Sequence, residues 1–196
     1  MQLGVLLLVC AVIMIVFGVL DNVFQPSKRH KWVVFWALCI LIAANAHPIQ
    51  AMTELRVNVA SVVLLFTSFA LCLRSPQKGV LLGLILGAVG GFAIYVLKLV
   101  SLGVEPGLFY GAAAAAIALP LIGSPQAAVL AAVFAPLAAD CVSSVADIIY
   151  CGYTVAEVGS SLMFDAQIVG LAFVLLTLVL VRIRRSRRTS DGMTKA

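Results

Sequence analysis

Residues 80–100 read VLLGLILGAVGGFAIYVLKLV, and this stretch decides the fold class. It contains no charged residue before Lys98. About 20 apolar residues in a helix span the roughly 30 Å hydrocarbon layer of a bilayer, so the stretch is typical of a transmembrane helix. The whole chain shares this character, because 63% of its 196 residues are hydrophobic, 11% are charged and the mean hydropathy is +1.16. This composition excludes a water-soluble domain and predicts an all-α polytopic membrane protein.

Similar apolar runs lie on both sides of this stretch, separated by charged residues or turn formers. Together they predict about seven spans, the others being near residues 3–20, 32–46, 57–73, 108–123, 127–150 and 162–181. The run at 32–46 is short for a full crossing, so a re-entrant second segment with six spans is the alternative. Residues 1–181 are expected to form one transmembrane helical domain, followed by a basic tail at 182–196.

The basic residues predict the orientation. With the N-terminus outside and the C-terminus in the cytoplasm, all of the thirteen Lys and Arg residues except Arg56 and Lys98 fall on the cytoplasmic side. This asymmetry follows the positive-inside rule and favours a multi-pass protein of the prokaryotic cytoplasmic membrane. The same clusters flank apolar segments and do not form a folded basic face, so membrane lipid is the expected contact and nucleic acid is not.

Four glycines predict a close helix contact. Gly79, Gly83, Gly87 and Gly91 recur every fourth residue and form one small-residue stripe, which lets another backbone approach. The expected partner is the span at 108–123, which begins near Gly107 and Gly111 and continues into a run of alanines.

Three aspartates within apolar segments are the main chemical signal. An aspartate at membrane depth costs on the order of 3 kcal/mol and needs a partner, a proton or water. Asp140 and Asp147 share a helix face, while Asp165 lies one turn into the last span, at a depth similar to that of Asp147. We expect Asp147 and Asp165 to form a carboxyl pair on the outer side. The alternative is that both lie at the interface, with Asp165 stabilising the start of its own helix after Ser160 and Ser161.

Other polar residues are predicted on the same outer side, forming a vestibule: Asn45, His47, Glu54, Arg56, Asn58, Lys98 and Glu105. Arg56 is a candidate to neutralise one of the acids. His47 has no second ligand at metal-binding spacing, so no metal site and no cofactor are predicted. The sequence from Thr154 to Glu157 fits a capping box and predicts one helical turn in the last outer loop.

Several short motifs resemble those of a prokaryotic multi-pass membrane family, domain of unknown function 1614. The motifs are residues 57–59 (VNV), 146–149 (ADII), 158–159 (VG) and 164–165 (FD). The family pattern has Ala-Asp-Leu-Leu before a glycine-rich turn and Phe-Asp-Gly, with two glycines after an Asn-Val segment. Asp147, Asp165 and Asn58 occupy matching positions, whereas this chain has serines in the turn and no glycine after Asp165. The resemblance implies a multi-pass fold and directs attention to the two aspartates, but it brings no activity.

Three functions fit these observations. The first is a small permease or ion-coupled subunit that binds a proton, cation or cationic solute at Asp147, Asp165 and Asp140, with Asn58 and His47 nearby. The second is a structural or assembly subunit, acting as a homo-oligomer or with a membrane protein partner. The third is an intramembrane aspartyl protease, although the Gly-x-Gly-Asp signature is missing. No catalytic residue is assigned, and the sequence leans away from an enzyme.

Overall fold

The computed structural model describes residues 3–16, 28–45, 49–52, 55–73, 77–100, 105–152 and 156–193. Within these ranges the predicted helical class is confirmed, and three short strands accompany the helices. In chain order the elements are α1 (Leu3–Val16), α2 (Lys28–Asn45), β1 (Ile49–Met52), β2 (Leu55–Val57), α3 (Val59–Cys72), α4 (Gln77–Lys98), α5 (Pro106–Ala118), the 3₁₀ turn η1 (Leu119–Leu121), α6 (Pro125–Cys151), β3 (Ala156–Val158) and α7 (Ser161–Met193).

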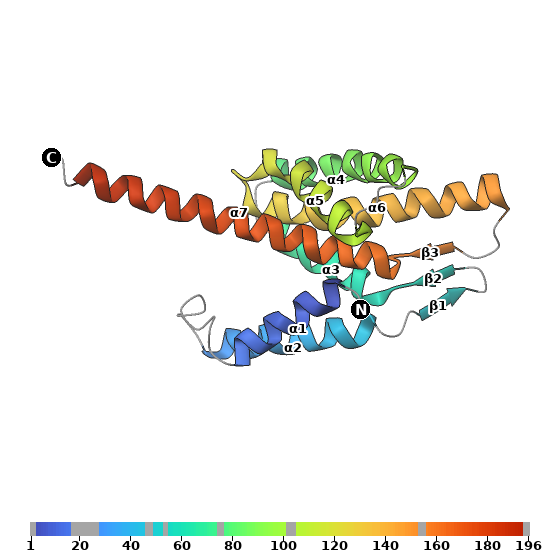
Figure 1. Cartoon of the computed structure of the whole chain (residues 1–196), viewed down its shortest axis with the longest axis horizontal. Coiled ribbons are helices and arrows are strands. Elements are labelled where there is room, and N and C mark those ends of the chain that lie inside the picture. Colours follow the sequence, from blue (N-terminus) through green and yellow to red (C-terminus); the bar gives the residue numbers. More distant parts are fainter. Residues whose placement is uncertain are drawn as a thin grey trace.

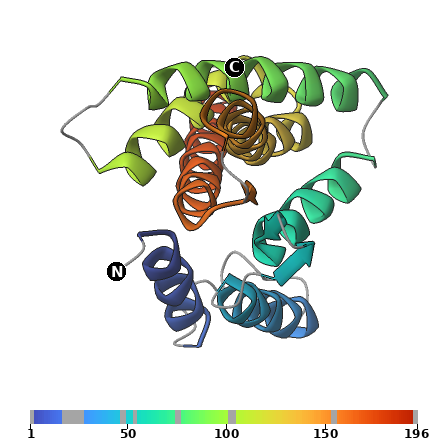
Figure 2. The same cartoon turned by 90° about the vertical axis from the view of Figure 1, so that its right-hand side faces the viewer.

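Helix α6 forms the centre of the bundle (Figure 1). In the most apolar 18-residue stretch of each long helix, 67% is buried in α6, compared with 28% in α4 and 33% in α7. Figure 2 shows α6 and α7 in the middle, with α4 across one side and α1 and α2 on the opposite side. Alanines such as Ala127, Ala131 and Ala135 are fully enclosed, because small side chains let the surrounding helices approach α6 closely.

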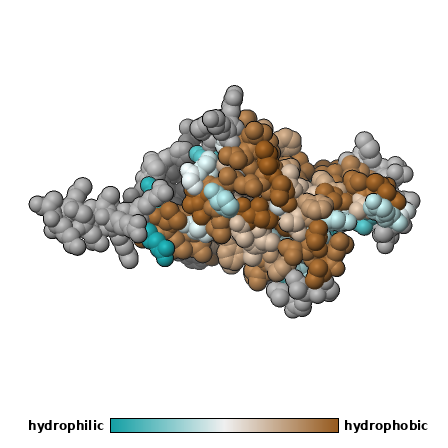
Figure 3. Space-filling model, turned by 90° about the horizontal axis from the view of Figure 1, so that it is seen from above, coloured by the Kyte–Doolittle hydropathy of each residue, from teal (hydrophilic) through white to brown (hydrophobic). Residues whose placement is uncertain are grey.

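Three helices in the described part of the chain are long and apolar enough to cross a membrane. These stretches are Gly79–Lys98, Pro125–Tyr150 and Ser161–Arg184. The other apolar helices are shorter, at Leu3–Val16, Trp32–Asn45, Val59–Cys72 and Pro106–Leu121. Apolar residues cover the middle of the face seen in Figure 3. The molecule therefore has the surface and helix lengths of a membrane-embedded protein, and the count of seven crossings stays a prediction.

The glycine stripe of α4 packs on a different helix from the one expected. A Cβ added at Gly91 would lie 2.5 Å from Ala138 Cβ, and one added at Gly87 would lie 2.7 Å from Phe134 Cδ1. Both neighbours belong to α6, so the expectation that the stripe pairs with α5 is wrong. Helix α5 packs on α7 instead, because Gly111 leaves space for Val169. The sequence identifies the small face of a helix but not which neighbour covers it.

A three-stranded sheet at one end of the bundle replaces the helical turn predicted for residues 154–157. The strand order is β1-β2-β3, with β1 and β2 antiparallel and β2 and β3 parallel. Thr154 lies outside the described residues, and Glu157 lies in β3 opposite Arg56 of β2. The predicted turn is therefore wrong at Glu157, because the backbone there pairs with β2. The parallel pairing joins residues about 100 positions apart, which no local pattern indicates.

Two further expectations concern the lengths of the helices. Helix α2 continues without interruption from Lys28 to Asn45, while residues 46–48, which include His47, lie outside the described ranges. Helix α7 extends to Met193, so the described part of the predicted basic tail is helical.

Candidate functional site

Asp140 is held at the start of α7. Ser160 precedes the first residue of α7, and its Oγ accepts a hydrogen bond from Met163 N at 3.4 Å, as an N-cap serine does. Asp140 of α6 then accepts two bonds from Ser160, from the backbone N at 2.7 Å and from Oγ at 3.2 Å. The positive end of the α7 dipole favours a carboxylate at this place. Asp140 thereby joins α6 to the first turn of α7.

Lys98, from the end of α4, supplies the counter-charge. Its Nζ lies 3.6 Å from Asp140 Oδ1 and donates a hydrogen bond to Ser143 Oγ at 3.1 Å. The Asp140 side chain is 4% exposed and that of Lys98 is 30% exposed, so the pair is sheltered on the acid's side and open on the lysine's side. Lys98 therefore takes the neutralising role for which Arg56 was a candidate, and the exposed Arg56 lies in β2.

These groups open into a polar recess of about 200 Å³ between α4, α6 and β3. The Ser144 hydroxyl donates to the backbone oxygen of Glu157 at 2.8 Å and fixes β3 against α6. Asp147 is exposed and lines the recess two turns beyond Asp140. The full lining consists of Lys98, Asp140, Ser143, Ser144, Asp147, Ala156, Glu157 and Ser160. Three carboxyl residues face one lysine, so the lining favours a cation over an anion.

Asp165 lies elsewhere and has a different role. The residue is 5% exposed, and its Oδ1 accepts a hydrogen bond from Gly4 N at 3.0 Å. Gly4 is the second residue of α1, where backbone N–H groups have no partner within the helix. A Cβ added at Gly4 would lie 2.7 Å from Asp165 Oδ1, and one added at Gly107 of α5 would lie 3.1 Å from Asp165 Cβ. Asp165 thus caps α1 between two glycines, and it does not stabilise the start of α7.

The recess brings Asp140, and not Asp165, together with Asp147. Helical geometry explains why Asp165 turns away. Gln167 donates from Nε2 to Val133 O of α6 at 2.9 Å, so this position of α7 faces α6. Asp165 precedes Gln167 by two residues, which is a rotation of about 200°, so it faces the side of α7 toward α1 and α5. The expected similar depth is also wrong, because Asp140 is level with Ser160: Asp147 lies about 10 Å from that level toward the end of α6, and Asp165 lies about 7 Å from it in the opposite direction along α7.

Asn58 caps a helix and does not line the recess. It is the N-cap of α3, where Oδ1 accepts from Ala60 N at 3.0 Å, and its Nδ2 donates to Asn45 Oδ1 at the end of α2 at 2.8 Å. Its backbone N also donates to Val158 O of β3 at 3.0 Å. Gly159 follows with φ 72°, and a Cβ there would lie 2.7 Å from Ser61 Cβ. Asn58 therefore ties α2, α3 and β3 together beside the start of α7.

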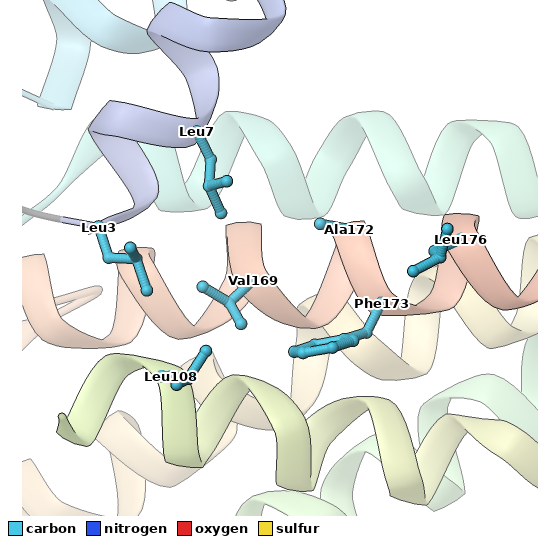
Figure 4. Close-up of a pocket in the computed structure, with 7 residues that line it drawn as sticks. All are labelled: Leu3, Leu7, Leu108, Val169, Ala172, Phe173 and Leu176. Carbon is cyan, nitrogen blue, oxygen red and sulfur yellow. The ribbon is translucent and has the colours of Figure 1, made fainter. Parts of the chain in front are cut away.

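A second cavity, of about 240 Å³, lies between α1, α5 and α7. Figure 4 shows the side chains of α1 and α5 converging on α7. Its lining is entirely apolar: Leu3, Leu7, Leu108, Val169, Ala172, Phe173 and Leu176. This cavity offers no charged or hydrogen-bonding side chain for chemistry. Among the described residues, no group of three or more His, Cys, Asp or Glu side chains is placed to hold a metal ion.

Sequence reasoning missed the partners of Asp140. Ser160 was expected before the start of the last helix but not as a partner of Asp140. Ser143, which contacts Lys98, and Ser144, which contacts Glu157, carried no distinctive pattern, since serine is common within apolar helices. Lys98 did carry a signal, because it ends an apolar run on the side where basic residues are otherwise depleted. A lone lysine there implies a nearby acid, which the structure identifies as Asp140.

Comparison of the chain with protein-family models, with curated proteins and with solved structures finds no match. The resemblance to the family of unknown function therefore stays a prediction, and the site must be interpreted from its own geometry.

Proposed function

We propose that this chain is a seven-span protein of the prokaryotic cytoplasmic membrane that binds a small cation or a proton on its outer side, as a permease or ion-coupled subunit. With the N-terminus outside, the end of α4, the end of α6 and the start of α7 all lie at the outer face. The recess at these three helix ends is the observation that carries the proposal. It joins a sheltered Asp140–Lys98 pair to the exposed carboxyl group of Asp147.

The arrangement suggests how a cation would bind. Asp147 is exposed and can attract a cation from solution, while Asp140 lies deeper and already faces an ammonium group. An arriving cation competes with Lys98 Nζ for Asp140 Oδ1, and Lys98 is exposed enough to move its charge toward water. The volume of about 200 Å³ equals roughly six water molecules at about 30 Å³ each, which suits a hydrated ion or a small amine.

Reconstitution of the full chain into liposomes tests this proposal. We would measure proton flux with an enclosed pH-sensitive dye, together with sodium and methylammonium uptake. We expect at least one of these cations to cross, and Asp147→Asn and Asp140→Asn each to lower the rate about tenfold or more, because a charge-assisted bond is worth roughly 1.5–3 kcal/mol. Glu105→Gln is the matched control, since Glu105 is an exposed acid before α5 with no side-chain capping bond. Rates equal to those of empty liposomes, or unchanged in the double variant, would contradict the proposal.

A structural or assembly subunit is the second candidate, favoured by a specific observation. Both buried acids, Asp140 and Asp165, bind the first turns of helices in their own chain. Under this alternative the apolar helices contact lipid, a second copy or a membrane protein partner, and the recess needs no ligand. Partner capture or self-association that survives Asp140→Asn with Asp147→Asn, in a chain without cation flux, would support it. The protease hypothesis requires two carboxyls at one water, and Asp165 is committed to α1 instead.

A further inference from the structure

The seam between α6 and α7 carries a second polar position below the recess. Asp140 faces Ser160 at the recess, and Val133 faces Gln167 farther along the same seam. Val133 precedes Asp140 by seven residues in α6, and Gln167 follows Ser160 by seven residues in α7, which is a rise of about 10 Å along each helix. The second position therefore lies well inside the bundle, directly inward from Asp140.

Gln167 is fully buried there with half of its amide unused. The residue is 0% exposed, and its Nε2 donates to Val133 O at 2.9 Å. Its Oε1 accepts no hydrogen bond from any described residue. A buried acceptor without a donor is costly, and native proteins usually satisfy such an atom with a protein group or an ordered water. Two buried hydroxyl groups of α3 are already engaged, since Ser68 Oγ donates to Leu65 O and Ser61 Oγ donates to Gly159 O.

Pro136 creates a second acceptor at the same level. Proline has no amide hydrogen, so it cannot donate to the carbonyl oxygen of Ala132 one turn earlier in α6. That oxygen faces α7, because a Cβ added at Gly170 would lie 3.6 Å from it. Gly170 is one turn from Gln167, so the amide oxygen and the freed carbonyl are on neighbouring helices at similar depth. Helix α5 approaches α7 closely here, since a Cβ added at Gly170 would also lie 3.2 Å from Gly111 O.

We propose that a water-sized hydrogen-bond donor, either a water molecule or an ammonium ion, is bound beside Pro136, between Gln167 Oε1 and Ala132 O. Two acceptors without a donor match a molecule that can give two hydrogen bonds. We infer the binding site from the geometry of α6 and α7 alone. That a cation entering at Asp140 binds there next rests on the proposed function.

A crystal structure of the full chain in a lipidic phase, at a resolution that shows ordered water, tests the site. Crystals grown without ammonium should show one isolated density within hydrogen-bond distance of both oxygens, if the donor is water. If the density appears only after ammonium is added, the donor is ammonium. In Gln167→Met, which keeps the length of the side chain and removes the acceptor, we expect this density to vanish while Asp140, Lys98 and Ser160 keep their contacts.

Two results would overturn the inference: Gln167 Oε1 bonded to a protein group with no density beside it, or a density that persists unchanged in Gln167→Met. Ser68→Ala is the matched control, because Ser68 is a buried hydroxyl satisfied within its own helix, and it should leave the density in place. None of these outcomes depends on transport. A chain that moves no cation yet shows the density would refute the proposed function and retain the site.

Discussion

Asp140 and Asp165 are both buried carboxylates that accept a backbone N–H at the start of a helix, but they differ in what surrounds the rest of the side chain. Asp165 lies between Gly4 and Gly107, whose missing side chains let α1 and α5 close around it. Asp140 binds Ser160 on one side and faces Lys98 and a recess of about 200 Å³ on the other. Asp165 is therefore enclosed by backbone, whereas Asp140 borders space that a ligand can enter.

The comparison teaches that membrane depth alone does not make an acid functional. Both acids gain from the positive end of a helix dipole, which explains how each is tolerated in an apolar segment. Of these two acids, Asp140 faces a partly exposed side-chain counter-charge, Lys98, whereas the partner of Asp165 is a backbone N–H that cannot leave. The proposed binding role is therefore assigned to the acid whose partner can be exchanged.

The largest expected effect is at Asp140. Asp140→Ala removes both bonds to Ser160 and leaves Lys98 without its carboxylate, so we expect the free energy of unfolding to fall by about 3 kcal/mol. Asp140→Asn keeps an acceptor for Ser160 N but loses the ion pair, so it should recover only part of this loss. Detergent-induced unfolding, followed by circular dichroism, measures both variants. Equal stability of Asp140→Ala and the native chain would show that the α6–α7 contact does not depend on this acid.

An intermediate effect is expected at Asp165. Asp165→Ala should lower the free energy of unfolding by about 2 kcal/mol, because the first turn of α1 loses its acceptor. Asp165→Asn should restore most of that stability, since an amide oxygen can still accept from Gly4 N and no counter-ion is lost. The same unfolding assay gives the two values. If Asp165→Asn were as damaging as Asp165→Ala, the charge would matter at this site, and the contrast with Asp140 would fail.

Cation flux separates the two acids further if the proposed function holds. Asp165→Asn should transport at the native rate, because Asp165 is not among the described residues that line the recess. A loss of flux comparable to that of Asp140→Asn would restore Asp165 as a binding residue.

The sequence predicts the helices well and their neighbours poorly. Apolar runs locate α4, α6 and the start of α7 to within three residues, because burial in lipid demands about 20 apolar positions in a row. Helix α7 continues to Met193, beyond the predicted end at 181. The stripe from Gly79 to Gly91 indicates close packing, yet α6 and not α5 covers it. Which of several apolar helices meets a given face depends on the whole assembly, and a single sequence does not encode it in local pattern.

The candidate site shows the same division. The three aspartates stand out because acids are rare in apolar segments, and Asp147 does line the recess. Their partners are not readable, because Ser160 and Lys98 meet Asp140 from positions 20 and 42 residues away along the chain. The pairing expected between Asp147 and Asp165 assumed similar depth, but α6 continues about three turns beyond the level at which α7 begins. It also required a rotation of α7 that the packing of Gln167 on α6 does not allow.

The smallest expected effect on stability is at Lys98, and it bears on how the recess works. Lys98→Met keeps much of the apolar stem and removes the ammonium group, so we expect a loss of about 1 kcal/mol in the free energy of unfolding, limited because solvent already reaches this side chain. Without the competing charge, Asp140 should bind a cation more tightly, and the concentration of cation needed for half-maximal uptake should fall. Lys98→Arg is the matched control, since it keeps the charge and should behave like the native chain. A rise in that concentration in Lys98→Met would mean that the ammonium group helps to build the site, and the idea of competition between Lys98 and the ligand would have to be abandoned.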